Sequence, residues 1–373
     1  MSEFTIVEVE SKKDLKRFVR FPLELYKNCP QYVPALDSSE ISSLTKCSTL
    51  AYCERKMWLA KDGSKVVGRI AAMINPRYNE LYGTKRVRFG WFDVINDIEV
   101  ARLLLDTAEN WARSKGMTQV HGPLYYNTLG KQGMLVEGFE NIPPFNCLYN
   151  YKYYNDFMLA LGYERECDWI QYELDVDVEV PDALKRISER IKERGGLREA
   201  DFGSLKKDKS LVHDFFRMYS DSFTDKVYNF IPFTDEEIEE EASSISGFLD
   251  DKLSCVLVDG EGEMAGFGIG IPFLSQAFQK AGGKLFPLGW IYLLKALRNR
   301  EKADLMLNGA SPKWQKSGIS SVYHVLMSEK YRRAGVKKVI TNPQIETNSA
   351  VNVWSRYENK RLYMRRRCYL KNI

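Results

Sequence analysis

One order of secondary-structure patterns occurs twice along the chain of 373 residues: hairpin, strand, helix, strand, helix and strand. In the first half, apolar alternation over residues 57–74 breaks at Asp62-Gly63, a dipeptide that favours a tight turn. A strand pattern over 86–95 follows, and Asn96-Asp97 then caps a helical pattern that stops at Gly116. A strand from residue 118, then a helix and a strand over 153–176, complete this half.

The second half repeats the order with little residue identity. A hairpin pattern over residues 253–273 and a strand pattern over 302–312 precede a helical pattern over 319–335. A strand, a short helix over 347–358 and a last strand over 361–371 follow. Such alternation is typical of mixed α/β proteins. We therefore predict an α/β (α+β mixed sheet) fold made of two similar units, residues 1–178 and 179–373.

Composition excludes several classes of protein. Hydrophobic residues at 44 % and charged residues at 28 % are ordinary globular values. The net charge of only +4 gives little support to a nucleic-acid partner. The N-terminus lacks the apolar region of a secretory signal, and the apolar run over 285–297 is too short to span a bilayer. We expect a cytoplasmic protein without a membrane span, in which that run forms a buried or amphipathic helix.

Cysteine and histidine usage argues against metal and disulfide scaffolds. The seven cysteines are odd in number and form no CxxC pair, and the three histidines show no HxxxH spacing. We expect no metal site and a reducing compartment. No G-x-S-x-G nucleophile motif occurs either.

The segment with the clearest chemistry runs from Pro312 to Ser320, between a strand and a helix. A strand that turns directly into a helix presents free backbone N–H groups and the positive end of the helix dipole, where anions bind. Gly318 lacks the Cβ that would block close approach, and Lys316 adds positive charge. The alternative is an ordinary loop with solvated lysines.

The element order and this loop resemble the GNAT superfamily of N-acyltransferases, whose coenzyme loop reads Q/R-x-x-G-x-G/A. Gln315 and Gly318 match, and Ser320 departs mildly from the last position. The resemblance implies a second unit that binds acetyl-CoA or another acyl-CoA as co-substrate. The residues it assigns to the coenzyme are Ala310, Ser311, Gln315, Lys316, Ser317, Gly318, Ile319, Ser320 and Asn348.

The first half resembles the same family without the coenzyme loop. Residues 96–99 contain no glycine and bring two carboxylates, Asp97 and Glu99, where phosphates would need cations. The first unit is therefore expected to have lost coenzyme binding. The whole chain resembles bacterial tandem-GNAT proteins through three short stretches, His121-Gly122-Pro123, residues 133–139 and Pro143-Pro144.

Residues 121–154 form a stretch rich in Gly, Asn, Pro and Tyr that is long for a connection. Its aromatic rings with polar tips suit an amphipathic acceptor pocket, and they equally suit packing between the two units. For most of these tyrosines we favour packing between the units.

Transfer from a thioester to an amine needs a base for the amine and an acid for the leaving thiolate. Members of the family often use a tyrosine as the acid, and here Trp354 takes that position. The catalytic candidates are therefore Glu346 as the base and Tyr357 or Tyr323 as the acid. Glu346 is equally explained as a helix N-terminal charge.

The resemblance implies an acyl-CoA-dependent N-acyltransferase that acts on an amine of a small molecule or peptide. Two alternatives stay open. One is a non-catalytic tandem-GNAT scaffold or CoA sensor, which Trp354 and Ser320 favour. The other is an aminoacyl or long-acyl transferase of the peptidoglycan-linking type, which the tyrosine-rich stretch favours.

Overall fold

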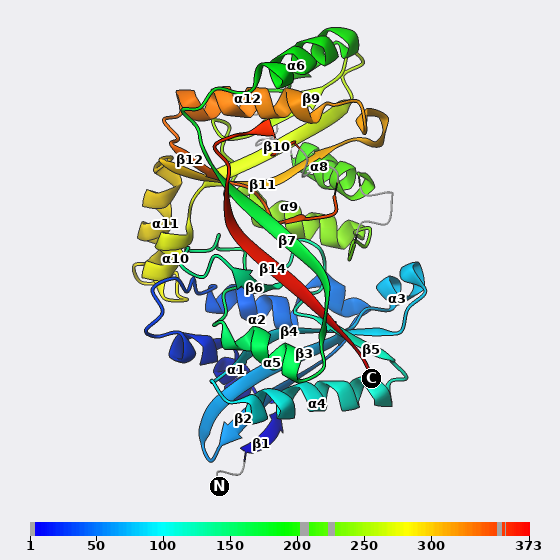
Figure 1. Cartoon of the computed structure of the whole chain (residues 1–373), viewed down its shortest axis with the longest axis vertical. Helices are drawn as coiled ribbons and strands as arrows, with labels where there is room; N and C mark the ends of the chain where they lie inside the picture. The colour runs from blue at the N-terminus through cyan, green and yellow to red at the C-terminus, as the bar shows by residue number, and fades with distance from the viewer. Residues whose placement is uncertain (1–3, 202–208, 223–227, 349–352, 355) are drawn as a thin grey trace. The chain divides into compact units, whose positions relative to one another are not determined.

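The computed structural model describes residues 4–201, 209–222, 228–348, 353–354 and 356–373 (Figure 1). The chain divides into two compact units. Unit 1 comprises Met1–Ile170, Ser275–Tyr292 and Met364–Ile373, and unit 2 comprises Gln171–Leu274 and Leu293–Tyr363. Among the helices described, none combines the length and apolar character that a bilayer crossing requires.

The sheet of unit 1 has one parallel pair, β4 beside β5, in an otherwise antiparallel order β1-β2-β3-β4-β5-β14. The strands are β1 (Phe4–Glu8), β2 (Glu54–Asp62), β3 (Lys65–Ile74), β4 (Arg86–Val94), β5 (Gln119–Gly122) and β14 (Arg361–Asn372), with β6 (Met134–Glu137) also paired to β14. The predicted hairpin turn at Asp62-Gly63 joins β2 to β3, as expected.

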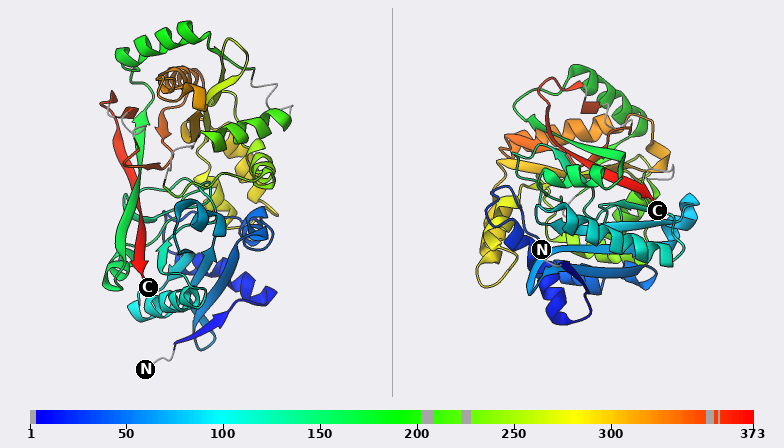
Figure 2. Two further views of the ribbon diagram at one scale, coloured as in Figure 1. Left: turned by 90° about the vertical axis from the view of Figure 1, so that its right-hand side faces the viewer. Right: turned by 60° about the horizontal axis from the view of Figure 1, so that its bottom comes forward.

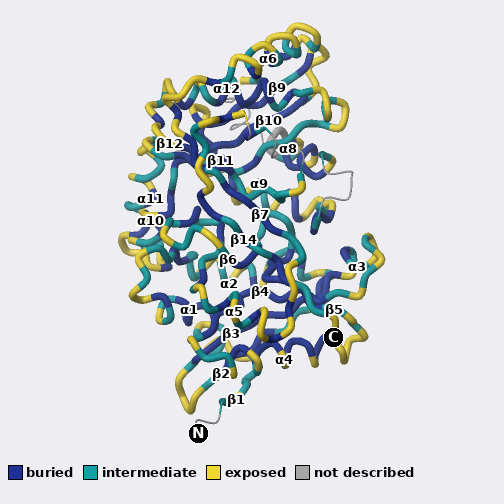
Figure 3. Tube along the Cα trace, in the orientation of Figure 1, coloured by how far each residue is buried: buried dark blue, intermediate teal, exposed yellow. Residues whose placement is uncertain are grey.

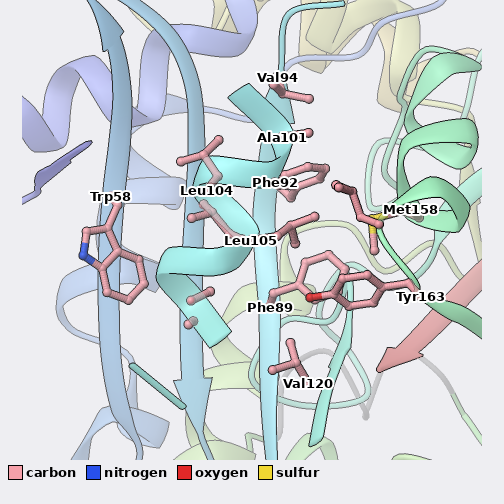
Figure 4. Packing of buried hydrophobic residues seen from close by; sticks show 14 of the residues in the cluster. Trp58, Phe89, Phe92, Val94, Ala101, Leu104, Leu105, Val120, Met158 and Tyr163 are labelled. Atoms are coloured by element: carbon pink, nitrogen blue, oxygen red, sulfur yellow. The ribbon is translucent and has the colours of Figure 1, made fainter. Parts of the chain in front are cut away.

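Helices cover both faces of this sheet. Along β2, Trp58 and Ala60 pack in the cluster of α4 (Ile98–Ser114), whereas Met57 and Leu59 pack in the cluster of α1 (Lys12–Leu25) and α2 (Asp37–Thr45). This alternation follows the two-residue period of a strand. Figure 4 shows Leu104 and Leu105 of α4 in one cluster with Phe89, and the views of Figure 2 show α4 running beside the strands. Unit 1 also contains α3 (Pro76–Tyr82), the 3₁₀ turn η1 (Ser48–Ala51), α5 (Tyr153–Ala160) and α10 (Ser275–Ala281).

The sheet of unit 2 repeats the arrangement, with β11 parallel to β12 and the other registered pairs antiparallel. Its order is β7-β12-β11-β10-β9-β8, and β13 pairs with β7. The strands are β7 (Glu164–Asp175), β8 (Arg198–Glu199), β9 (Cys255–Val258), β10 (Met264–Pro272), β11 (Lys302–Ala310), β12 (Lys338–Ile340) and β13 (Gln344–Ile345). Figure 3 colours β10 largely as buried.

The helices of unit 2 are α6 (Asp182–Gly195), α8 (Lys209–Asp221), α9 (Asp235–Ser246), α12 (Ser320–Arg333) and the 3₁₀ turn η2 (Pro312–Trp314). Helices α12 and α6 pack together over a core that includes Val322, Met327 and Leu305. On β10, the ring of Phe267 contacts Phe215 of α8 at 4.3 Å between centroids. One further helix, α11 (Gly289–Arg298), has residues in both units.

The units differ from the expected boundaries at residues 178 and 179, because each sheet is completed by a strand from another part of the chain. In unit 1, Leu370 of β14 pairs with His121 of β5, so the C-terminal residues belong to this unit. In unit 2, Leu174 of β7 pairs with Val339 of β12, so this unit begins inside β7. Local periodicity shows where a strand lies but not which edge it joins.

Two other expectations concern helices. The apolar run over 285–297 is not buried as a whole: α11 is amphipathic, with Leu293 buried and Leu294 half exposed. The short helix expected over 347–358 includes residues 349–352 and 355, which lie outside the described residues.

Candidate active site

The parallel strands of unit 2 separate after a short paired segment. Lys302, Ala303 and Asp304 pair with β12, but β11 then continues to Ala310 beside β10 alone. After β12, the N–H of Thr341 donates to Tyr172 of β7 at 2.8 Å. The backbones of β11 and of the chain after β12 thus turn to different partners, and the space between them is bridged by side chains.

The loop after β11 holds two residues in the left-handed backbone region. Lys316 has φ +60° and Gly318 has φ +88°. The Ser317 hydroxyl donates to the Trp314 carbonyl at 2.7 Å and accepts the N–H of Ile319 at 3.2 Å. Helix α12 then begins at Ser320 with no side chain capping its first turn. Within the described residues, the N–H groups of Gly318 and Ser320 have no acceptor, so they are available to an anion.

The charges around this loop are not equivalent. Lys313 is bound to Asp259 at 2.9 Å and to Glu261 at 2.7 Å, and this ammonium holds the pKa of Asp259 at about 2. Lys316 is exposed and forms no ion pair with any described residue. The Gln315 amide donates to the Ser222 carbonyl, which turns this side chain toward the end of α8. Of the two lysines in the motif, Lys316 is the one whose charge remains available.

Gly318 is required by its surroundings as well as by its backbone angle. A Cβ at this position would lie 2.9 Å from Cδ1 of Ile191 and 3.5 Å from Cγ2 of Ile187, both on α6. A Cβ on Gly195, at the end of the same helix, would overlap the ring of Trp314. Helix α6 therefore lies directly against the candidate coenzyme loop.

The first two residues assigned to the coenzyme belong to the end of β11 and the turn that follows it. Ala310 pairs with Gly266 of β10, and its carbonyl accepts the Ser222 hydroxyl at 2.8 Å. The N–H of Ser311 donates to the Ala265 carbonyl at 2.9 Å. Both residues are half-buried, and their backbone groups named here are already paired.

Unit 1 lacks the features that make the loop of unit 2 a candidate anion site. The carboxylate of Asp97 accepts the N–H of Glu99 at 2.9 Å and so caps α4 with negative charge. Beyond the parallel pair, the N–H of Leu124 donates to the Phe89 carbonyl at 2.8 Å, and Tyr125 stacks on Trp91 with ring centroids 3.6 Å apart. The corresponding space of unit 1 is occupied by its own chain.

Where β11 and β12 have separated, a chain of side-chain hydrogen bonds crosses the space. Asn308 donates to the hydroxyl of Tyr323 at 3.3 Å, and Asn342 donates to Asn308 at 3.4 Å. Gln344 donates to Asn342 at 3.1 Å, and the indole N–H of Trp354 donates to Gln344 at 2.6 Å. Sequence reasoning singled out the two ends of this chain and missed the three amides between them.

Trp354 is buried and packs edge-on against His324, with ring centroids 4.8 Å apart and planes at 86°. Sequence reasoning did not select His324. Burial lowers the pKa of this histidine to about 4, so its imidazole is neutral at pH 7, and its Nε2 has no hydrogen-bond partner among the described residues. Trp354 therefore packs against His324 and donates a hydrogen bond to Gln344. The resemblance would place at this position the acid that protonates the thiolate.

The candidate acids differ in their surroundings. Burial raises the pKa of both Tyr323 and Tyr357, for Tyr357 to about 12, so both hydroxyls keep their protons at neutral pH. The hydroxyl of Tyr323 lies beside Asn308, past the last residue of β11 that pairs with β12. The side chain of Tyr357 is instead influenced by Ser328 of α12, which acts against the effect of burial on its pKa. Glu346 and Asn348 are half-buried just after β13, where the N–H of Asn348 donates to Ile345 at 2.9 Å.

Unit 1 contains a pocket of about 490 Å³, including its open mouth. It is lined by charged and aromatic side chains, among them Tyr32, Asp37, Glu40, Arg69, Asp93, Tyr125, Lys131 and Tyr149. At its base, Arg69 and Asp93 form a buried ion pair at 2.7 Å, and Tyr26 donates to Asp93 at 3.0 Å. Burial raises the pKa of Asp93 although Arg69 opposes the shift.

The tyrosines of residues 121–154 make their hydrogen bonds within unit 1. Tyr151 donates to the Leu25 carbonyl at 3.3 Å, and Tyr153 donates to the Val94 carbonyl at 2.7 Å. Tyr125 and Tyr149 instead line the pocket. These contacts fix the stretch onto α1 and β4 of its own unit, whereas the sequence-based interpretation favoured packing between units.

One group of potential metal ligands occurs among the described residues. His121, Glu166 and Cys368 place ligand atoms within 4.8 Å of one another. The guanidinium of Arg86 already binds Glu166 at 2.6 Å. Because that cation neutralises the carboxylate, the group has little charge left to hold a metal ion.

Two curated proteins match the chain over nearly its whole length. Protein YghO of Escherichia coli (strain K12) is 27 % identical over 371 residues, which are 97 % of this chain and 94 % of that protein. The bacterial ceramide synthase of Caulobacter vibrioides is 26 % identical over 380 residues, covering 97 % of each chain. No protein-family model matches.

Solved structures match across both units. A tandem GNAT protein from the clavulanic acid biosynthesis pathway aligns with a TM-score of 0.56 and 13 % identity, over 99 % of this chain and 98 % of the other. A GCN5-related N-acetyltransferase from Sphaerobacter thermophilus aligns with a TM-score of 0.52 and 12 % identity, over 99 % and 95 %. The duplicated sheet, with its single parallel pair in each unit, is therefore the tandem GNAT fold.

Proposed function

We propose that the protein is an acyl-CoA-dependent N-acyltransferase whose coenzyme binds unit 2. The observation that carries the proposal is the loop from Lys316 to Ser320. It combines the N–H groups of Gly318 and Ser320, which have no acceptor among the described residues, with an uncapped helix N-terminus and an exposed lysine. Such a terminus attracts a pyrophosphate through backbone donors and the helix dipole.

The separated strands suit the rest of the coenzyme. Beyond Asp304, the Asn308–Asn342 contact bridges β11 to the chain after β12, and no backbone pair between described residues joins these two segments there. A pantetheine arm could pair with these free strand edges, as an extended peptide does when it adds to a sheet. The thioester would then lie near Asn308 and Tyr323.

The chemistry requires a neutral amine to attack the thioester carbonyl. The C–N bond forms, the C–S bond breaks, the amine loses a proton and the thiolate of CoA gains one. We assign protonation of the thiolate to Tyr323, because its hydroxyl lies beside the strand opening and keeps its proton at neutral pH. Glu346, directly after β13, is the proposed base.

The name of the relative from Caulobacter vibrioides supports the choice of a long-chain amine as the acceptor substrate. A ceramide is the amide of a fatty acid with a long-chain amino alcohol, so the activity in that relative's name forms the same kind of bond as an N-acyltransferase. We therefore propose long-chain acyl-CoA and a long-chain amino alcohol as the first donor and acceptor to test. Acetyl-CoA and short amines form the comparison set.

The test separates binding from turnover. Thermal unfolding is followed with acetyl-CoA and palmitoyl-CoA, since a ligand at a hundred times its dissociation constant adds about 2.7 kcal/mol of stability. Lys316→Glu should weaken binding by about tenfold or more, because it reverses the charge beside the phosphates. Lys27→Glu makes the same charge change at an exposed residue of unit 1 and should leave binding unchanged. Equal binding by wild type and Lys316→Glu would reject the site.

The second candidate function is a CoA-binding protein without turnover. Trp354 favours it, because its indole N–H is bound to Gln344 and is far too weak an acid to protonate a thiolate. Release of free CoA from acyl-CoA in the presence of an amine decides between the two functions. Binding without any amine-dependent release would favour the sensor.

A further inference from the structure

The turn between α10 and α11 exposes large apolar side chains to solvent. Phe286 is 76 % exposed, Leu288 54 % and Trp290 43 %, and these three residues form what we call the apolar turn. Among the described residues, eight large hydrophobic side chains are exposed, and Leu294 on the next turn of α11 is a fourth within the same short segment. Figure 3 colours this part of the chain as largely exposed, beside the labels α10 and α11. Contiguous exposed apolar groups usually mark a binding surface.

In the sequence segment that contains the apolar turn, every charged side chain is basic. Residues 264–300 contain no aspartate or glutamate. Lys280, Lys284, Lys295 and Arg298 are all exposed, and none of the four forms an ion pair with any residue that the structure describes. The carboxylate of Asp37, on α2, lies beside Gly283, but it already forms an ion pair with Arg20.

Hydrogen bonds hold the apolar turn in one conformation. The indole N–H of Trp290 donates to the Pro287 carbonyl at 2.9 Å, and the backbone N–H of Trp290 donates to Leu285 at 2.9 Å. Helix α10 is in turn fixed to unit 1, because Gln279 donates to the carbonyls of Pro30 and Tyr32. The apolar side chains are therefore presented outward by an ordered segment.

We propose that the apolar turn docks on the surface of a lipid bilayer that contains anionic headgroups. Phe, Leu and Trp next to lysine and arginine are the composition of segments that lie in the interface, where aromatic rings sit at the headgroup level. The unpaired cations complement anionic headgroups, which attract basic residues near the surface. A protein partner would equally cover apolar groups, but the absence of any acidic residue over 264–300 specifically matches an anionic surface. This inference does not depend on the acyl transfer proposed above.

The experiment is co-sedimentation of the full chain with vesicles. Vesicles of phosphatidylcholine alone are compared with vesicles containing one quarter phosphatidylglycerol. The wild type should bind the anionic vesicles at least tenfold more tightly, and 0.5 M salt should weaken this preference because the charges are screened.

Two variants separate the apolar from the charged contribution. Phe286→Ser with Leu288→Ser removes two side chains whose high exposure makes them dispensable for folding, and it should lower binding to anionic vesicles at least tenfold. Lys280→Glu with Lys284→Glu should abolish the preference for anionic vesicles. The matched control, Leu81→Ser with Leu159→Ser, changes two exposed leucines elsewhere in unit 1 and should bind like the wild type. Circular dichroism checks that each variant is folded.

Three results would overturn the proposal. The wild type could stay in the supernatant with both kinds of vesicle. It could bind, but equally well after Phe286→Ser with Leu288→Ser. Finally, light scattering could show a wild-type dimer that this double variant dissociates, in which case a second copy of the chain covers the apolar turn.

Discussion

Asn342 donates its side-chain amide to Asn308 across 3.4 Å, and this contact joins β11 to the chain after β12 beyond the last backbone pair between them. The contact is long for a hydrogen bond, so it contributes little energy and is easily displaced. A ligand that enters between the strands would lose little by separating these two amides. The same position would bring it beside the hydroxyl of Tyr323.

Tyr323→Phe should lower kcat with amine and acyl-CoA by about a hundredfold or more, because general acid catalysis typically contributes that much. The affinity for acyl-CoA should hardly change, since the substitution removes only one hydroxyl. Single-turnover kinetics with binding measured separately gives both quantities. Tyr357→Phe is the matched control, because it removes the same hydroxyl from a second buried tyrosine of unit 2, and it should retain most of the activity. If Tyr357→Phe is the slower enzyme, our assignment of the acid is wrong.

Gly318→Ala should destabilise the protein by about 1–2 kcal/mol from its left-handed backbone angle alone. The new Cβ would also lie 2.9 Å from Ile191, which adds to the loss. Urea unfolding measures the change. Gly63→Ala is the matched control, with φ +55° and nothing within 4 Å of the new Cβ. Equal losses in the two variants would show that α6 does not constrain the loop.

Asp93→Asn should cost about 3–5 kcal/mol of stability, because it leaves the buried guanidinium of Arg69 without its counter-charge. The comparison is Asp14→Asn, which breaks a partly exposed contact with Arg17 and should cost far less. Equilibrium unfolding in urea measures both. A small loss for Asp93→Asn would mean that the pocket of unit 1 admits enough water to solvate Arg69.

Much of the fold follows from local sequence. Asp62-Gly63 marks the first hairpin, Asp97 marks the start of α4, and Gly318 marks the turn into α12 because its backbone angle excludes most other residues. Each of these signals lies within a few residues of the element that it specifies.

The features that sequence reasoning missed depend on long-range pairing. Leu370 joins β5 of unit 1, and the amides of Asn308 and Asn342 meet only because β11 and β12 are neighbours. The buried pair of Arg69 and Asp93 likewise forms across two strands. No periodicity within one segment encodes these meetings, and an isolated Asn or Arg in a strand pattern is ordinarily a surface residue.

Asp304 should make the protein less stable as the pH rises from about 5 to 8. Its side chain is buried, neither carboxylate oxygen has a hydrogen-bond partner among the described residues, and burial raises its pKa from 3.8 to about 8. Between the unfolded and folded pKa values the folded state holds a proton that the unfolded state has released. The free energy of unfolding therefore falls with rising pH, by up to about 1.4 kcal/mol per pH unit from this group. Urea unfolding at pH 5, 6.5 and 8 measures the slope. Asp304→Asn, which cannot ionise, should flatten it, and a variant that kept the wild-type slope would assign the pH dependence to another group.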